Sequence, residues 1–108
     1  MKATDTFRKT PFKHNCAQAI AYRWNNLFDN NDIVSTYAPY IGGHAPEGYC
    51  GALYAAMQAC PKYADKIKDE FTNICGATRC YAIKTENRTP CEICVDTADK
   101  LVEKYSDL

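Results

Sequence analysis

The seven cysteines are the residues of this chain best suited to chemistry. Seven thiols cannot all pair within one chain, and the N-terminal segment lacks the apolar centre of a secretion signal, so we expect a cytoplasmic protein whose thiols stay reduced. Thiolate chemistry, meaning metal ligation or redox work, is then favoured over a disulfide scaffold. The cysteines are Cys16, Cys50, Cys60, Cys75, Cys80, Cys91 and Cys94.

Three of these cysteines are predicted to lie in the first turn of a helix. Asn15 is a good N-cap before Cys16, Thr89-Pro90 precedes Cys91, and Cys50 follows a glycine-containing loop. The unpaired N–H groups and the positive dipole end of a helix favour the thiolate. An iron–sulfur centre with four thiolates is a net anion, so helix N-termini around it would offset its charge.

A fourth candidate is Cys80, which follows Gly76 in a stretch that is typical of a turn between helices. Its side chain could reach inward without helical constraint. The candidate ligand set is therefore Cys16, Cys50, Cys80 and Cys91, one cysteine from each of four segments. A binuclear [2Fe–2S] cluster is our preferred cofactor, and zinc, which suits the same thiolates, is the alternative.

The other three cysteines have simpler interpretations. Cys60 would lie about 15 Å from Cys50 along an unbroken helix, too far to share one compact cluster. Cys75 and Cys94 lie on the apolar stripes of their helices, so we expect them to pack as small apolar side chains. The stripe of Cys75 also holds Ile67, Phe71 and Ile74.

Two further readings use the same residues differently. Cys91 and Cys94 form a C-x-x-C pair, which favours a metal-free thiol-disulfide oxidoreductase with Cys91 as nucleophile and Cys94 or Cys16 as its partner, although such dithiols normally occur in a βαβ pattern. His14 and His44 could supply imidazole ligands, but a polar surface histidine is the commoner case. A helical interaction module without cofactor is the plainest alternative.

Helices must hold these cysteines in position, and the apolar periodicity of the sequence predicts where the helices lie. Apolar spacing predicts helices over about 16–28, 33–38, 50–60, 61–75 and 91–105, with breaks at 29–32 and in the loop 41–48, and alternating strand patterns are missing. The fold class is therefore all-α, a compact bundle of four to five short helices. The small residues of 50–60, Gly51 among them, would let another backbone approach and suit the centre of the bundle. Residues 1–13 are interpreted as an N-terminal arm, and 14–108 as one helical cysteine-rich redox domain.

Charge and hydropathy exclude several classes of partner. The 108 residues carry 13 basic and 13 acidic side chains, interspersed, so no single-signed field attracts nucleic acid or a membrane surface. No apolar run approaches the roughly 20 residues of a membrane span. We expect an unidentified redox protein as partner, and a homodimer stays open.

The motifs together resemble a known family. Asn15-Cys16-Ala17-Gln18-Ala19, Gly42-Gly43, Cys50-Gly51-Ala52-Leu53-Tyr54-Ala55, Cys75-Gly76-Ala77-Thr78-Arg79-Cys80 and Cys91-Glu92-Ile93-Cys94-Val95 occur in the order typical of the redox-active family named C_GCAxxG_C_C after its cysteine motif. The resemblance covers roughly residues 14–105. It implies a helical domain related to the iron–sulfur-binding C-terminal part of split-Soret cytochrome c, where cysteines hold a binuclear cluster.

Carried over position by position, the family cysteines match Cys16, Cys50, Cys80 and Cys91. The chain departs from the pattern at Ala55, where the motif has its second glycine. Cysteines also replace apolar residues at 60, 75 and 94, so a substituted ligand set stays open. The haem-binding half of the cytochrome has no counterpart, since no C-x-x-C-H occurs, and any electron partner must be another molecule.

Overall fold

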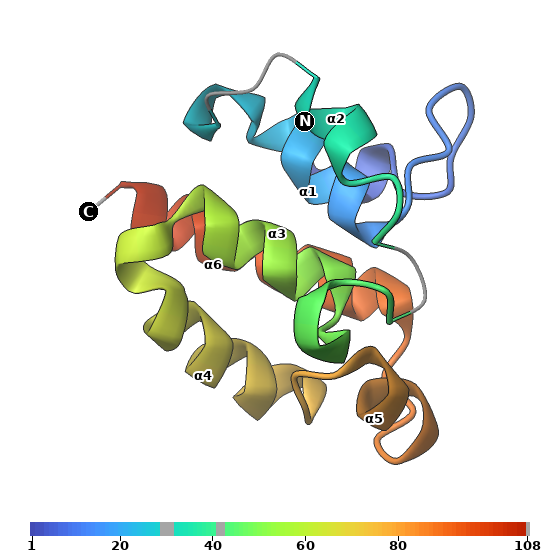
Figure 1. Cartoon of the computed structure of the whole chain (residues 1–108), viewed down its shortest axis with the longest axis vertical. Coiled ribbons are helices and arrows are strands. Elements are labelled where there is room, and N and C mark those ends of the chain that lie inside the picture. Colours follow the sequence, from blue (N-terminus) through green and yellow to red (C-terminus); the bar gives the residue numbers. More distant parts are fainter. Residues whose placement is uncertain (29–31, 41–42, 108) are drawn as a thin grey trace.

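The computed structural model of the chain describes residues 1–28, 32–40 and 43–107, and within these ranges it contains six α-helices and no strand (Figure 1). This confirms the all-α prediction, with more helices than expected. The predicted break at 29–32 and the glycine pair at 42–43 lie partly outside the described residues. The helices are α1 (Cys16–Arg23), α2 (Ile33–Thr36), α3 (Gly51–Ala59), α4 (Ala64–Cys75), α5 (Cys80–Thr85) and α6 (Cys91–Ser106).

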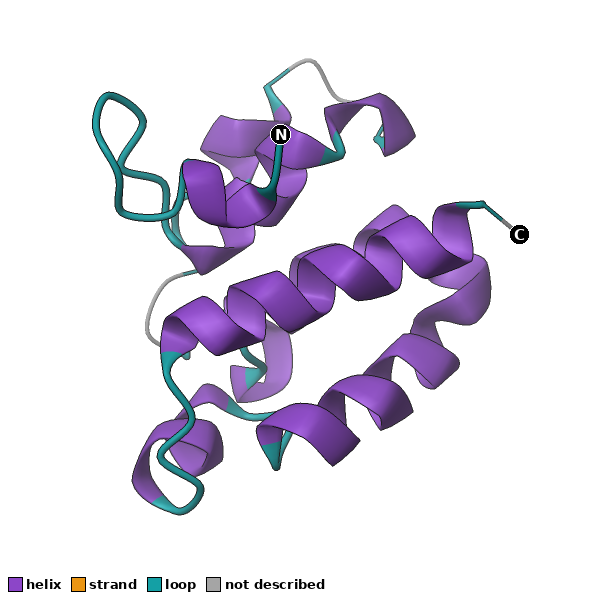
Figure 2. Ribbon diagram, turned by 180° about the vertical axis from the view of Figure 1, so that it is seen from behind, coloured by secondary structure: helices purple, strands orange, loops and turns teal. Residues whose placement is uncertain are grey.

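Helix α3 lies at the centre of the bundle, as its small residues predict. It packs against α1 on one side and against α4 and α6 on the other (Figure 1). Seen from behind in Figure 2, α6 runs across the molecule between α1 and α4. Ala52, Ala55 and Ala56 are fully buried, so short side chains let three helices surround α3 closely.

Helix α4 shows the predicted amphipathic pattern with one correction. Ile67, Phe71 and Cys75, spaced four residues apart, are fully buried, whereas Ile74 is 60% exposed. Ile74 lies to the side of the buried row, because each residue advances about 100° around the helix. Gly76 ends α4 in the left-handed conformation with φ 96°, a geometry that glycine adopts without strain.

Several helix boundaries differ from the sequence prediction. Helix α1 ends at Arg23 rather than near residue 28, because Trp24 leaves helical geometry with ψ 29° and a short 3-10 turn, Asn25–Leu27, follows. Residue 80 begins a helix instead of lying in a turn. Pro90 is the N-cap of α6, and the Thr89 hydroxyl donates to the Cys75 carbonyl at 2.9 Å. No helix of the described ranges is both long and apolar enough to span a membrane.

The first residues pack more tightly than a loose arm would. Ala3, Thr6 and Phe7 are buried, and a short 3-10 turn, Ala3–Asp5, contacts α1 and α6. The backbone N–H of Ala3 donates to Asp99 Oδ2 at 3.0 Å. The sequence shows no helical periodicity here, because packing against the core holds this segment in place and a long helix does not.

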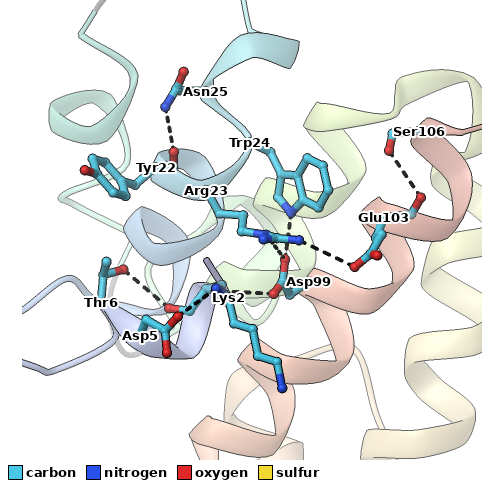
Figure 3. Close-up of polar contacts among 11 residues, drawn as sticks. Lys2, Asp5, Thr6, Tyr22, Arg23, Trp24, Asn25, Asp99, Glu103 and Ser106 are labelled. Carbon is cyan, nitrogen blue, oxygen red and sulfur yellow. Dashed lines mark hydrogen bonds and ion pairs between the residues drawn. The ribbon is translucent and has the colours of Figure 1, made fainter.

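Asp99 of α6 is a buried carboxylate that ties three segments together (Figure 3). Its side chain accepts from Trp24 Nε1 at 2.7 Å and from Arg23 Nε at 3.0 Å, in addition to Ala3 N–H. The residue is only 3% exposed. A buried carboxylate is costly unless its oxygens are hydrogen-bonded, so this network fixes the N-terminal segment and the end of α1 to α6.

We expect Asp99→Ala to lower the free energy of unfolding by about 3 kcal/mol, because one buried and two partly buried donors lose their shared acceptor. Glu103→Gln is the matched control, since Glu103 also pairs with Arg23, at 3.4 Å, but its side chain is 61% exposed. Its cost should stay below about 1 kcal/mol. Urea unfolding followed by circular dichroism measures both, and equal costs would contradict the role of the network.

Candidate functional site

Five cysteines surround one small pocket of about 60 Å³. The four candidate ligands, which the sequence places in separate segments, all contribute to its wall, and Cys94 is the fifth thiol. Their roles as ligands stay a prediction, but their proximity is a property of the fold. The residues that line the pocket are Arg8, Asn15, Cys16, Cys50, Cys80, Ile83, Lys84, Cys91 and Cys94.

All four candidate ligands lie where a helix begins. Cys16, Cys80 and Cys91 are the first residues of α1, α5 and α6, and Cys50 is the N-cap of α3. These helix starts lie on the side of the bundle where α5 is seen in Figure 1. The N–H groups at these ends are not used within the helices, so the pocket is surrounded by donors suited to anionic sulfur.

Local sequence explains the position of Cys16. Asn15 Oδ1 accepts from the backbone N–H of Gln18, and the Gln18 side chain accepts from the Asn15 N–H, so the predicted capping box is present. The Asn15 side chain also donates to the Ala38 carbonyl at 3.0 Å. The cap therefore sets where α1 begins and also anchors that end of the helix to the segment after α2.

Gly51 lets α1 approach the N-terminus of α3. A Cβ atom at Gly51 would lie 2.6 Å from the Tyr40 carbonyl oxygen, 2.8 Å from Cys16 Sγ and 3.1 Å from Ala17 Cβ. Distances below 3.0 Å are steric overlaps, so only glycine fits. The close backbone approach expected for this glycine is confirmed, and it is what brings Cys16 beside Cys50.

Cys50 is the thiol best placed to ionise. The Cys16 and Cys94 thiols hydrogen-bond to it, and together with the N–H groups of Leu53 and Ala52 they lower the pKa of Cys50 well below its usual value despite burial. The hydrogen bond to Cys50, followed by burial, raises the pKa of Cys16. Hydrogen bonds to Cys50 and Cys75 likewise raise the pKa of Cys94. The interactions among the three thiols therefore favour ionisation of Cys50 over ionisation of Cys16 or Cys94.

Cys94 and Cys75 extend this row of sulfur atoms into the core. Hydrogen bonds from Cys94 and Thr97 lower the pKa of Cys75, with burial opposing them in part. Both cysteines are buried, as the apolar stripes predict, at 2% and 0% exposure. Packing is not the whole role of Cys94, because it also lines the pocket. The sequence feature that could have indicated this second role is the C-x-x-C spacing, because it sets Cys91 and Cys94 on one face of α6.

Two positively charged side chains lie at the pocket, and the sequence alone did not indicate them. Arg8 and Lys84 both line it. Burial raises the pKa of Cys80, and the nearby Lys84 partly offsets this rise. Although burial opposes it, the charges of Cys91 and Cys80 raise the pKa of Lys84, so the ammonium group balances developing thiolate charge.

Three other candidate residues lie away from the pocket wall. Cys60 ends α3 and is buried, which raises the pKa of its thiol. His44 is exposed, as expected. His14, expected at the surface, is buried instead at 9% exposure, where its Nδ1 hydrogen-bonds to the Thr6 hydroxyl and burial lowers its pKa.

Whether the cysteine pocket can hold a metal ion or cluster depends on the donor atoms that surround it. Among the residues that the structure describes, no group of three or more His, Cys, Asp or Glu side chains is arranged to hold a metal ion. The chemistry of the donors nevertheless suits one, because thiolates are the ligands of iron–sulfur clusters and of structural zinc. Five thiols, helix N-termini and two cations fit a soft, anionic inorganic group.

Comparisons with known proteins add no relatives to this description. No family model matches the chain, and neither the curated proteins nor the solved structures contain a significant match. The fold and the cysteine pocket therefore rest on the chain's own residues, and the family resemblance stays an expectation.

We expect Gly51→Ala to destabilise the chain by about 2 kcal/mol or more and to displace Cys16, because the new methyl group overlaps backbone and sulfur. Gly48→Ala is the matched control. A Cβ at Gly48 meets no atom within 4 Å, so its φ of +74° alone should cost about 1 kcal/mol. Chemical unfolding compares the two variants, and a cheaper change at Gly51 would contradict the packing argument.

The thiolate of Cys50 should be measurable directly. In the reduced, metal-free chain we expect an ultraviolet thiolate absorbance that persists as the pH falls below the usual thiol range, because Cys50 stays ionised there. Cys50→Ser should remove this lowest titration step, and Cys60→Ser should leave it. Loss of the step in Cys60→Ser, or its survival in Cys50→Ser, would assign the thiolate elsewhere.

Proposed function

We propose that the chain is a redox-active protein that binds an iron–sulfur cluster, binuclear by preference, through Cys16, Cys50, Cys80 and Cys91, as an electron carrier or redox sensor. The observation that carries this proposal is the meeting of these thiols around one pocket of about 60 Å³. Pockets for organic ligands usually measure roughly 300–1,000 Å³. A space of only a few atoms, walled by sulfur, suits an inorganic group.

The surroundings of the pocket support an anionic group. Each of the four cysteines begins or caps a helix, and Arg8 and Lys84 add two positive charges. When bound, the cluster would supply one-electron transfer. The chain's own contributions would be thiolate ligation, N–H groups directed at sulfur and exclusion of water by Ile83, all of which influence a reduction potential.

Zinc remains the alternative metal for the same thiolates, as a structural or sensory site. Cys94 is an alternative ligand, because it lines the pocket and contacts Cys50. The family resemblance favours Cys80 over Cys94, so we assign Cys80 to the ligand set. A redox protein is the proposed partner and the cytoplasm the proposed compartment, with neither nucleic acid nor membrane involved.

A second candidate function is supported by the lowered pKa of Cys50. A stabilised thiolate between the thiols of Cys16 and Cys94 is the arrangement that a thiol-disulfide oxidoreductase requires. The nucleophile would then be Cys50 rather than Cys91, the residue that the C-x-x-C spacing suggests. Both functions use one pocket, so the presence or absence of a cofactor separates them.

We expect the chain to be brown when it is produced and purified without oxygen, with iron and sulfide in equal amounts and an electron paramagnetic resonance signal on reduction. Cys16→Ser, Cys50→Ser, Cys80→Ser and Cys91→Ser should each lose most of the iron. Cys60→Ser is the matched control and should keep it, since Cys60 does not line the pocket.

Three results would overturn parts of this assignment. A colourless chain with one equivalent of zinc would support the alternative metal. A colourless, metal-free chain that reduces disulfides through Cys50 would support the second function. Retention of iron in Cys80→Ser together with its loss in Cys94→Ser would exchange these two residues in the ligand set.

A further inference from the structure

Three exposed, positively charged side chains lie around the cysteine pocket. Arg8 and Lys84 line the pocket itself, and Arg79 and Lys84 line a wider groove of about 380 Å³ that shares Cys80 with it. Among the described residues that line these two spaces, Glu47 is the single carboxylate. Positive charge is therefore in excess at this place, although the whole chain has no net charge.

The backbone that carries these three charges is held in place by the fold. The guanidinium carbon of Arg8 lies 4.8 Å from the centre of the Phe7 ring, which is buried. An isolated antiparallel bridge joins Arg79 to Tyr49, and Lys84 belongs to α5. Because these segments are in position before a partner arrives, little has to be ordered on binding, which lowers the cost of association.

The three cations are not neutralised by carboxylates of the chain. Within the described ranges, the ion pairs join α1 to α6, join α4 to α6 or lie within α6, and none of them includes these cations. A positive charge that is already paired contributes little to attraction over a distance. The three unpaired charges therefore remain available to a negatively charged partner.

The same place offers access to the thiols and an aromatic side chain. Cys16, Cys80 and Cys91 are partly exposed, so the cysteine pocket is reached from this side. Tyr81 of α5 lines the groove and is 76% exposed. Figures 1 and 2 both show α5 at the edge of the bundle. Aromatic and arginine side chains are enriched in protein interfaces and among the residues that supply most of the binding energy.

We propose that this cationic face, made of Arg8, Arg79, Tyr81 and Lys84, docks an acidic redox protein that carries carboxylates around its own electron-transfer centre. The inference rests on the proposed redox function and names the chemistry of the partner. One electron passes between the two proteins, so one is oxidised as the other is reduced, and no covalent bond changes. Transient redox complexes are small, below about 1,200 Å², and electrostatic steering makes their association fast.

The binding test uses the full chain, reduced and free of metal, with its helix content confirmed by circular dichroism. The paramagnetic anion hexacyanochromate(III) broadens the amide resonances of residues that it approaches. We expect it to broaden Arg8, Arg79, Tyr81 and Lys84 first, whereas the cation tris(ethylenediamine)chromium(III) should leave them sharp. Salt at about 1 M should remove the effect, because the Debye length is then only about 3 Å.

Single charge removals locate the effect. Arg79→Gln and Lys84→Gln should each weaken the broadening, and the double variant should abolish it. Lys62→Gln is the matched control, because it removes one exposed positive charge from the turn Pro61–Tyr63, at the opposite end of α3 from Cys50. An equal loss in Lys62→Gln, or broadening that begins at residues outside the cationic face, would overturn the proposal.

Displacement of the chromium anion tests the class of partner. Polyglutamate, which imitates a carboxylate-rich protein surface, should restore the sharp resonances at a charge concentration no higher than a single-stranded oligonucleotide requires. A lower requirement for the oligonucleotide would identify a nucleic acid as the occupant and overturn the proposal.

A kinetic test covers the chain with its cluster bound. The reduced chain is mixed with hexacyanoferrate(III) or with the cation tris(phenanthroline)cobalt(III). We expect electron transfer to the anion to slow about tenfold as salt rises from about 10 mM to about 1 M, and transfer to the cation not to slow. A rate with hexacyanoferrate(III) that is independent of salt would contradict steering by this face. Because the broadening experiment needs no cofactor, its failure is distinguishable from a failure to bind iron.

Discussion

The close approach of α1 to the first turn of α3 is the contact on which the cysteine pocket depends. It is possible because Gly51 has no side chain, so Cys16 Sγ and the Tyr40 carbonyl can occupy the space that a Cβ atom would fill. With any larger residue, the two helices would separate and Cys16 would move away from Cys50. The absence of a side chain at Gly51 thus determines both the packing of the central helix and the spacing of the thiols.

The fold brings together five thiols that would repel one another if all of them were ionised. Five thiols beside one pocket could not all ionise, because like charges in a place with little water raise one another's pKa. The structure accommodates them by lowering the pKa of Cys50 and raising the pKa values of Cys16, Cys80 and Cys94. Any group that removes protons from the remaining thiols must bring positive charge of its own, which metal ions do.

Local signals allowed much of this architecture to be predicted from sequence. The capping box at Asn15 and Gln18 places Cys16, Gly76 ends α4, and periodicity gives α6 nearly its full length. Most of the missed features depend on contacts between distant segments. The burial of the first residues depends on Asp99, the contact of Cys94 with Cys50 depends on the crossing of α3 and α6, and the helix at Cys80 is too short for a periodic pattern.

The hydrogen bond between Ala3 and Asp99 joins residues that are 96 positions apart. The Ala3 N–H therefore finds its acceptor only when α6, almost a hundred residues further along the chain, has reached its place in the bundle. Closing so long a loop is entropically unfavourable until the intervening helices have collapsed. The docking of the N-terminal segment onto α6 should therefore be a late step of folding.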